Sequence, residues 1–167
     1  MVERQEKILE LLDTSGPRLH RLLARLTRRE DATGDLLQEL FLRLLNSRSF
    51  DKAQDPFAYA CRSAINLAFE WRREQKNACT ALEKDCPGVQ DDSSVLGKMI
   101  RAEELEHVLE ATARLKRLAR DVVVMRYIQQ DSYEQIAERL CKSPQHVRSI
   151  CAKAMAQLRE SVKNNHG

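Results

Sequence analysis

The chain has 167 residues, of which 43% are hydrophobic, 32% charged and only 5% aromatic, and its formal net charge is +3. This length suits one ordinary domain or two small ones, and the composition excludes a disordered chain and favours an all-helical fold. No stretch approaches the roughly 20 apolar residues of a membrane span and no N-terminal export signal is visible, so we expect a cytoplasmic protein.

The first part of the chain shows the periodicity of amphipathic helices. Residues 3–13 predict a short helix, and residues 18–29 predict a second one with leucines on one face and arginines on the other. The Gly16-Pro17 dipeptide between them is expected to break the helix.

A turn is expected next, over residues 31–34, because it contains Asp, Thr and Gly. Residues 35–45 predict a third helix with an apolar stripe of leucines and one phenylalanine. Its outer side mixes charges with an exposed leucine, Leu42, and such a face can dock a protein partner, although a plain surface is the commoner reading. Residues 46–55 are polar and read as irregular.

A fourth helix is predicted to open at Asp55-Pro56, an N-cap followed by a first-turn proline, and to run to about Asn77. Small and aromatic residues recur on its core face. The opposite face carries a stripe spaced by four, three and four residues: Arg62, Asn66, Phe69 and Arg73. Arginines with an amide and a ring between them suit single-stranded DNA, and the alternative is a solvated charged face.

Residues 78–97 lack a sustained helical period and read as a linker, and acidic residues outnumber basic ones from Ala78 to Glu106. Helical pattern returns over residues 99–115 and 118–128. The chain therefore predicts an all-α fold of two small helical domains: residues 1–77, a linker at 78–98, and residues 99–162.

Two helix starts lie about a dozen residues apart in the last quarter of the chain. Ser132 with Gln135 forms a capping box, and Ser143 precedes Pro144 as an N-cap. A short turn between two such helices is the layout of a helix-turn-helix, whose second helix reads the DNA major groove. The residues expected on its outer face are Gln145, His146, Arg148, Ser149, Ala152 and Lys153, and the alternative is the charged helix of a plain bundle.

The sequence predicts neither a metal or cofactor site nor an enzyme. The five cysteines form no CxxC pair and are expected to be free thiols, and a zinc or redox role for Cys79 and Cys86, with His107 not far beyond, is poorly supported. No HExxH, GxSxG, GxxxxGK[ST] or GxGxxG motif occurs. Paired carboxylates such as Glu103-Glu104 read as helix surface.

Three segments together resemble bacterial RNA polymerase sigma factors. DLLQELFLRLL (Asp35–Leu45) is similar to their region 2.2, PFAYACRSAINLAFEWRRE (Pro56–Glu74) resembles regions 2.3 and 2.4, and Ala113–Glu160 resembles region 4. The length, with only a linker between the two parts, is that of the extracytoplasmic-function class (group 4).

The resemblance implies a protein that performs no chemistry but binds core RNA polymerase, directs it to promoters and helps to melt the −10 element. The β′ clamp helices of the polymerase would be docked by Asp35, Leu36, Gln38, Glu39, Leu42 and Arg43. The −10 strand would face Arg62, Asn66, Phe69 and Arg73, and residues 46–55 would hold a flipped −10 base.

The resemblance also implies that the −35 element is read by Gln145, His146, Arg148, Ser149 and Lys153. The linker would thread toward the polymerase active-site cleft and RNA exit path, and the β subunit is a further contact. In the family an anti-sigma factor often masks both DNA-binding domains, which makes such a protein a candidate partner; no membrane insertion and no cofactor are implied.

The chain departs from the family pattern in the helix-turn-helix. Cys141-Lys142 stands where Gly and an apolar residue are usual, and a non-Gly residue in a left-handed conformation costs roughly 1–2 kcal/mol, so an altered turn is expected. Cys151 and Met155 stand where basic residues are common, which predicts weak or unusual −35 binding. Leu45 replaces a frequent Trp.

Two other readings remain open at this point. The chain fits a stand-alone helix-turn-helix regulator whose N-terminal half senses a ligand or dimerises, and it fits a helical adaptor that sequesters polymerase. The sigma-factor reading requires both the Asp35–Leu45 face and the Arg62–Arg73 stripe, whereas a repressor requires neither.

Overall fold

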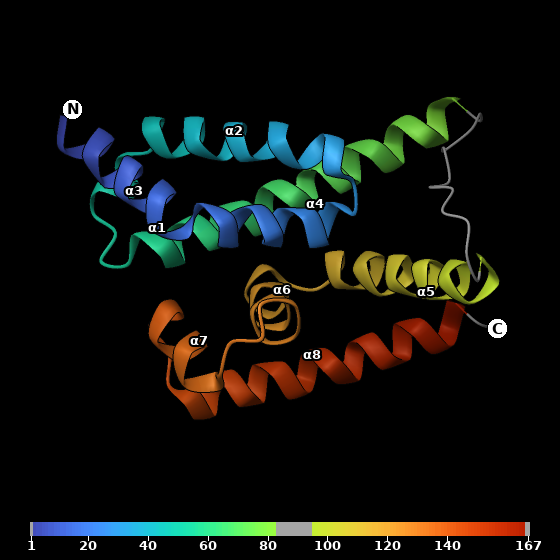
Figure 1. Ribbon diagram of the computed structural model, residues 1–167. Helices are drawn as coiled ribbons and strands as arrows, with labels where there is room; N and C mark the ends of the chain where they lie inside the picture. Colours follow the sequence, from blue (N-terminus) through green and yellow to red (C-terminus); the bar gives the residue numbers. More distant parts are fainter. Residues whose placement is uncertain (1, 83–94, 166–167) are drawn as a thin grey trace.

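The computed structural model describes residues 2–82 and 95–165, with side chains for 2–78 and 101–165, and every secondary-structure element in these ranges is a helix. The N-terminal helices form one layer and the C-terminal helices lie beneath it (Figure 1). The expected all-α fold of two helical domains is confirmed. Within the described residues, no helix is both long and apolar enough to cross a membrane.

The N-terminal half consists of α1 (Val2–Thr27), α2 (Glu30–Asn46), the short α3 (Arg48–Asp51) and α4 (Pro56–Leu82). Helix α1 packs against both α2 and α4. The apolar stripes predicted from the sequence meet here, and the core is built mainly from Leu19, Leu22, Leu23, Leu26, Leu40, Leu44 and Ile65.

The expected break at Gly16-Pro17 is wrong, because α1 runs through both residues. An internal proline removes one backbone hydrogen bond and normally costs about 3 kcal/mol or more. Here the apolar stripe continues on both sides of the proline, with Leu11 and Leu19 buried. Burial of that stripe against α2 and α4 offsets the local penalty, so tertiary packing overrides the helix-breaking signal.

The turn expected at residues 31–34 lies earlier, at Arg28 and Arg29, so α2 begins at Glu30. Arg28 adopts a left-handed φ of 57° and Arg29 is extended with φ −138°. The Thr33 side chain is fully buried and donates a hydrogen bond to the Arg29 carbonyl at 2.7 Å. This bond holds the first turn of α2 in a stretch whose composition predicted a loop.

The segment 46–55, expected to be irregular, contains α3. Ser47 caps this helix by accepting a hydrogen bond from the Phe50 amide at 3.2 Å. Phe50 is completely buried, and its ring meets Tyr59 edge to face with centroids 5.7 Å apart. The buried Phe50 ring therefore fixes a segment whose polar composition had predicted an irregular loop.

Helix α4 begins as predicted, since the Asp55 carboxylate accepts a hydrogen bond from the Ala58 amide at 3.0 Å. It continues to Leu82, and α5 begins at Val95, so helix extends into both ends of the segment expected to be a linker. The middle of that segment lies outside the described residues.

The C-terminal half consists of α5 (Val95–Ala113), α6 (Arg117–Val123), the π-helix η1 (Val124–Ile128), α7 (Tyr133–Leu140) and α8 (Pro144–Asn165). Helix α8 packs against α5, α6 and α7. The buried residues of this half include Val122, Val124, Met125, Ile136 and Val147.

The two halves meet along a seam in which α5 runs beside α4, and α6 lies between α4 and α8 (Figure 1). Their buried side chains form one contiguous cluster. The seam also contains arginines of the N-terminal half that contact carboxylates of the C-terminal half, as described below.

Candidate nucleic-acid interface

Local hydrogen bonds build the helix-turn-helix as predicted. Ser132 Oγ accepts from the Gln135 amide at 3.1 Å, and the Ser132 amide donates to Gln135 Oε1 at 2.9 Å, which completes the capping box. Ser143 Oγ accepts from the His146 amide at 3.2 Å and caps α8. These caps satisfy backbone donors that the first turn of each helix leaves without partners.

The turn between α7 and α8 is regular despite its cysteine. Cys141 adopts the left-handed conformation with φ 54° and ψ 44°. The Lys142 amide donates to the Ala137 carbonyl at 2.9 Å and the Cys141 amide to Glu138 at 3.3 Å, the two bonds of a Schellman motif. The expectation of an altered turn is therefore wrong.

The predicted reading face of α8 is exposed. Solvent reaches all five side chains expected to contact the −35 element: Gln145, His146, Arg148, Ser149 and Lys153. Val147 and Cys151 face the core with 0% and 2% exposure. Because Cys151 is buried, it takes no position on the reading face, and its lack of charge does not weaken that face.

Arg148 is held in place by its neighbours on α7. Its guanidinium donates to Glu134 at 2.9 Å and lies 5.3 Å from the ring centre of Tyr133. The pair with Glu134 leaves both side chains more than half exposed, so it is an accessible contact that a phosphate or base edge can replace.

The stripe on α4 faces the C-terminal half. Arg62 and Asn66 are partly exposed and Arg73 is exposed, whereas Phe69 is only 5% exposed. The structure therefore brings these four residues to one side of α4 but buries the ring that was expected on the outer face.

Helix α6 contacts this stripe directly. Arg62 Nε donates to Asp121 Oδ2 at 3.3 Å, and Asn66 Oδ1 accepts from Arg117 at 3.1 Å and also from Arg120. The Arg120 guanidinium lies 5.0 Å from the ring centre of Phe69.

Two buried carboxylates of the C-terminal half lie at the seam. Burial raises the pKa of Asp121, against the lowering effect of Arg120 and Arg62. Burial likewise raises the pKa of Asp131 despite Arg139 and Arg18. Removing a carboxylate from water costs free energy that nearby arginines only partly return.

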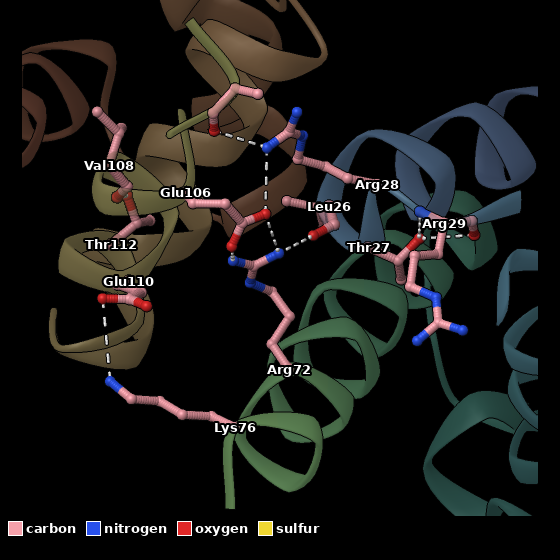
Figure 2. A network of polar contacts seen from close by, with 11 residues as sticks. Leu26, Thr27, Arg28, Arg29, Arg72, Lys76, Glu106, Val108, Glu110 and Thr112 are labelled. Carbon is pink, nitrogen blue, oxygen red and sulfur yellow. Dashed lines mark hydrogen bonds and ion pairs between the residues drawn. The ribbon is translucent and has the colours of Figure 1, made fainter. Parts of the chain in front are cut away.

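A third carboxylate joins the halves through a network that no sequence pattern indicated (Figure 2). Glu106 on α5 accepts from Arg72 at 2.5 Å and from Arg28 at 3.2 Å. Arg72 also donates to the Leu26 carbonyl at 3.0 Å, and Arg28 to the Ala102 carbonyl at 2.8 Å. Its members lie far apart in sequence, so neither periodicity nor spacing could have identified it.

The outer side of α2 forms a separate surface, away from the C-terminal half (Figure 1). Leu42 is 55% exposed, and Asp35 and Gln38 are exposed as well. Arg43 donates to Glu39 at 2.9 Å and to Glu70 on α4 at 3.0 Å. Of the six residues expected to dock the clamp, Leu36 alone is buried, at 8% exposure.

Among the described residues, no group of three or more His, Cys, Asp or Glu side chains is arranged to hold a metal ion. Burial raises the pKa of the Cys61 thiol to about 11. Cys61, Cys141 and Cys151 are free thiols. Cys86 and the side chain of Cys79 lie outside the described residues, so the metal or redox role considered for them stays untested.

Two family models match the chain. Residues 11–78 match "Sigma-70 region 2", and residues 111–160 match "Sigma-70, region 4". Neither description is that of an enzyme. The two matched ranges coincide with the N-terminal half and with most of the C-terminal half.

Similar proteins agree with these matches. The chain is 26% identical to the ECF RNA polymerase sigma factor SigX of Bacillus subtilis (strain 168), over 95% of this chain and 85% of the relative. Its fold is similar to that of the sigma factor RpoE from Bartonella quintana, solved in complex with the anti-sigma factor NepR. That match has a TM-score of 0.53 and 18% identity and covers 98% of each chain.

Proposed function

This chain belongs to the sigma-70 family as a sigma factor of the extracytoplasmic-function class, and we propose from that premise how its surfaces divide the work of transcription initiation. It binds core RNA polymerase and promoter DNA. The observation that carries the division is that two exposed faces, on α2 and α8, lie on different halves of the molecule.

The outer side of α2 is the proposed polymerase-binding face. Leu42 is an exposed apolar side chain between charged neighbours, the composition of a protein-docking patch rather than of a DNA contact. We assign Asp35, Gln38, Leu42 and the paired Glu39 and Arg43 to contact with the β′ clamp helices. Leu36, which is buried, would support this face from below.

The outer face of α8 is the proposed −35 reader. Its arginine and lysine can bind phosphates or guanine edges, its glutamine an adenine edge, and its serine either. The regular Schellman turn keeps α8 in the geometry that a helix-turn-helix uses to enter the major groove.

The α4 stripe is the proposed −10 reader. Arg62 and Arg73 would hold phosphates, Asn66 would pair with a base edge, and Phe69 would stack on a base once its cover is removed. The segment around α3, fixed by Phe50, would capture a flipped base.

The protein performs no chemistry of its own under this proposal, and its place is the cytoplasm with the polymerase. Run-off transcription with purified core polymerase on a random promoter pool tests the function. The selected promoters should share one element near −35 and one near −10. Sequence-specific duplex binding by a dimer, with no transcript in the presence of core, would instead support a stand-alone regulator. Core binding without a transcript from any promoter would support an adaptor.

A further inference from the structure

We propose that this chain binds a nucleoside polyphosphate in a groove between its two halves, with the phosphates on arginines of α1 and the base on Tyr127 of η1. We call the hollowed surface between the arginines of α1 (residues 18–29) and residues 127–129 the α1–η1 groove. None of its residues is among those assigned to polymerase or promoter DNA above, so the site adds a small-molecule ligand to the proposed function.

The groove has two connected parts. A small hollow of about 110 Å³ lies between three arginines of α1 and the end of η1. A larger cleft of about 580 Å³ adjoins it and reaches Leu105 on α5 and the Tyr127 ring. Arg25 and Ile128 line both parts, so one ligand can occupy the two together. The cleft alone has the volume of a small-molecule site, about 300–1,000 Å³.

Positive charge dominates this groove. Five arginines line it against one carboxylate, Glu30. Arg28 pairs with Glu106 at 3.2 Å and Arg29 with Asp31 at 2.7 Å, and both acids lie outside the lining (Figure 2 shows the first pair). The remaining three arginines are the ones that surround the small hollow.

These three arginines are poorly neutralised. Arg25 donates to the Ile128 carbonyl at 2.6 Å, and Arg21 is exposed and makes no hydrogen bond or ion pair within the described residues. Arg18 meets Asp131 only at 3.8 Å. Their spacing of three and four residues places them on one face of α1 over about 10 Å, long enough for a chain of phosphates. Guanidinium groups bind phosphate oxygens in pairs of parallel hydrogen bonds.

A buried acceptor in the small hollow favours a nucleotide over an inorganic anion. Gln129 Nε2 donates to Cys61 Sγ at 3.4 Å, whereas Gln129 Oε1 is buried without a hydrogen-bond partner in the described part of the chain. Such an unpaired acceptor costs free energy. A fully ionised phosphate chain has no proton to donate to it, whereas a ribose hydroxyl does.

The larger cleft provides a surface on which a base can stack. Tyr127 is 52% exposed and Leu105 is 42% exposed. Tyr127 lies in the π-helix η1, and single π-helical turns occur frequently at functional sites. Gln130, just beyond, has a left-handed φ of 60°, a strained conformation that recurs at ligand sites. An aromatic ring at the open end of an arginine-lined hollow matches a base attached to phosphates.

The ligand would contact both halves of the molecule, since α1 belongs to one half and α5 and η1 to the other. A ligand that binds only the docked halves stabilises them by mass action. At a hundredfold excess of free nucleotide over its Kd, we expect the unfolding temperature to rise by roughly 5 °C or more.

Isothermal titration calorimetry of the full chain with ATP and with GTP is the first test. At least one of them should bind one to one, and at least about tenfold more tightly than inorganic triphosphate or the free nucleoside. No binding by either nucleotide overturns the site. Inorganic triphosphate that binds as tightly as the nucleotide would reduce the groove to a plain anion patch.

Arg21→Ala tests the phosphate end. It should weaken nucleotide binding about tenfold or more, because a charge-assisted contact is lost. Since Arg21 has no partner among the described residues, the unfolding temperature without ligand should not change. Arg159→Ala, which alters an exposed arginine on α8 outside the groove, is the matched control. Equal affinities for the two variants overturn the assignment.

Tyr127 tests the base end. Tyr127→Ala should weaken nucleotide binding about fivefold or more and leave binding of inorganic triphosphate unchanged, because only the base loses its stacking partner. Tyr127→Phe keeps the ring and should stay within about twofold of wild type. Equal losses for the two variants, or a loss that also appears with inorganic triphosphate, overturn the placing of the base on this ring.

A single-stranded oligonucleotide separates the small-molecule site from a surface for nucleic-acid backbone. If it binds more tightly than the nucleotide and loses that affinity in Arg21→Ala, the groove holds nucleic acid and the proposal is overturned. All of these titrations use the chain without polymerase or promoter. Their failure therefore leaves the proposed function untouched, and absence of a run-off transcript would leave the nucleotide site untouched.

Discussion

At the level of single residues, exposure decides which predicted contacts a side chain can make. Leu36 and Leu42 both belong to the α2 segment that resembles region 2.2, yet Leu36 is 8% exposed and Leu42 is 55% exposed. Only Leu42 presents apolar surface to a partner. Full burial of one leucine side chain contributes about 1.5–3 kcal/mol, and each 1.4 kcal/mol or so is a tenfold change in affinity.

Leu42→Asp is therefore expected to weaken binding to core polymerase by at least about tenfold, because it places a charge in an apolar contact. Binding of the full chain to −35 duplex should be unchanged. Leu9→Asp, which alters an exposed leucine on α1, is the matched control. Pull-down with core and duplex anisotropy measure both effects; unchanged core affinity would remove α2 from the clamp assignment.

Replacement of Lys153 or Arg148 by Ala should weaken −35 duplex binding by about 1–3 kcal/mol if the residue reads a base, and should do so more for the cognate than for a scrambled site. If the residue only holds a phosphate, the loss should be equal for both duplexes and the salt dependence should flatten. Lys163→Ala, at the far end of α8, is the control, and a loss as large as that of Lys153→Ala would remove this face from base reading.

Asp121 predicts a pH dependence of stability. Burial raises its folded-state pKa above the unfolded value of about 3.9, so its charge destabilises the fold at neutral pH. That destabilisation disappears as the pH falls through the raised folded pKa toward the unfolded value. Asp121→Asn should therefore raise the unfolding temperature near pH 7, and its advantage over wild type should shrink toward pH 4. Circular dichroism across this range, with exposed Asp13→Asn as control, tests it; an advantage that grows in acid would refute the assignment.

At the level of elements, helix ends follow local hydrogen bonding and helix interiors follow packing. The caps at Asp55, Ser132 and Ser143 all form as their residue types predict. Helix α1 instead continues through Pro17, because leucines on both sides are buried against α2 and α4. A local breaker is thus overridden where an apolar stripe continues past it.

The α7–α8 turn offers a test of backbone strain. Cys141 has φ 54°, which costs a non-Gly residue roughly 1–2 kcal/mol. Cys141→Gly removes this strain but loses chain entropy, so we expect a gain of up to about 1 kcal/mol in the free energy of unfolding. Cys141→Ala keeps the strain and should give no such gain. Urea unfolding of the two variants measures the difference.

At the level of the whole molecule, one contiguous apolar cluster joins the two halves, and arginine–carboxylate contacts lie along the seam between them. The apolar stripes of α1, α2 and α4 meet in one half, and α8 gathers α5, α6 and α7 in the other. Arg62, Arg28 and Arg72 then meet carboxylates from across the seam. Apolar packing and ion pairs therefore both contribute to how the halves dock.

Salt tests how much of this docking depends on the ion pairs. The Debye length falls from about 10 Å at 0.1 M to about 3 Å at 1 M salt, which screens exposed pairs far more than apolar packing. We expect the radius of gyration from small-angle scattering to rise with potassium chloride while the helical circular dichroism signal stays constant. A radius that is independent of salt would mean that apolar contacts, rather than ion pairs, dominate the seam.

The amino-acid sequence by itself determined most of the helices, the caps at Asp55, Ser132 and Ser143, the helix-turn-helix and the family, because these depend on local periodicity, on short-range hydrogen bonds and on motifs that lie within single segments. The tertiary structure alone decided that α1 passes Pro17, that Phe69 is buried, and that Asp121 and Glu106 reach arginines of the other half. Those outcomes depend on residues far apart in the chain, whose contacts form only when the helices pack. For that reason the residues proposed to read promoter DNA could be located in sequence, whereas the contacts that cover some of them could not.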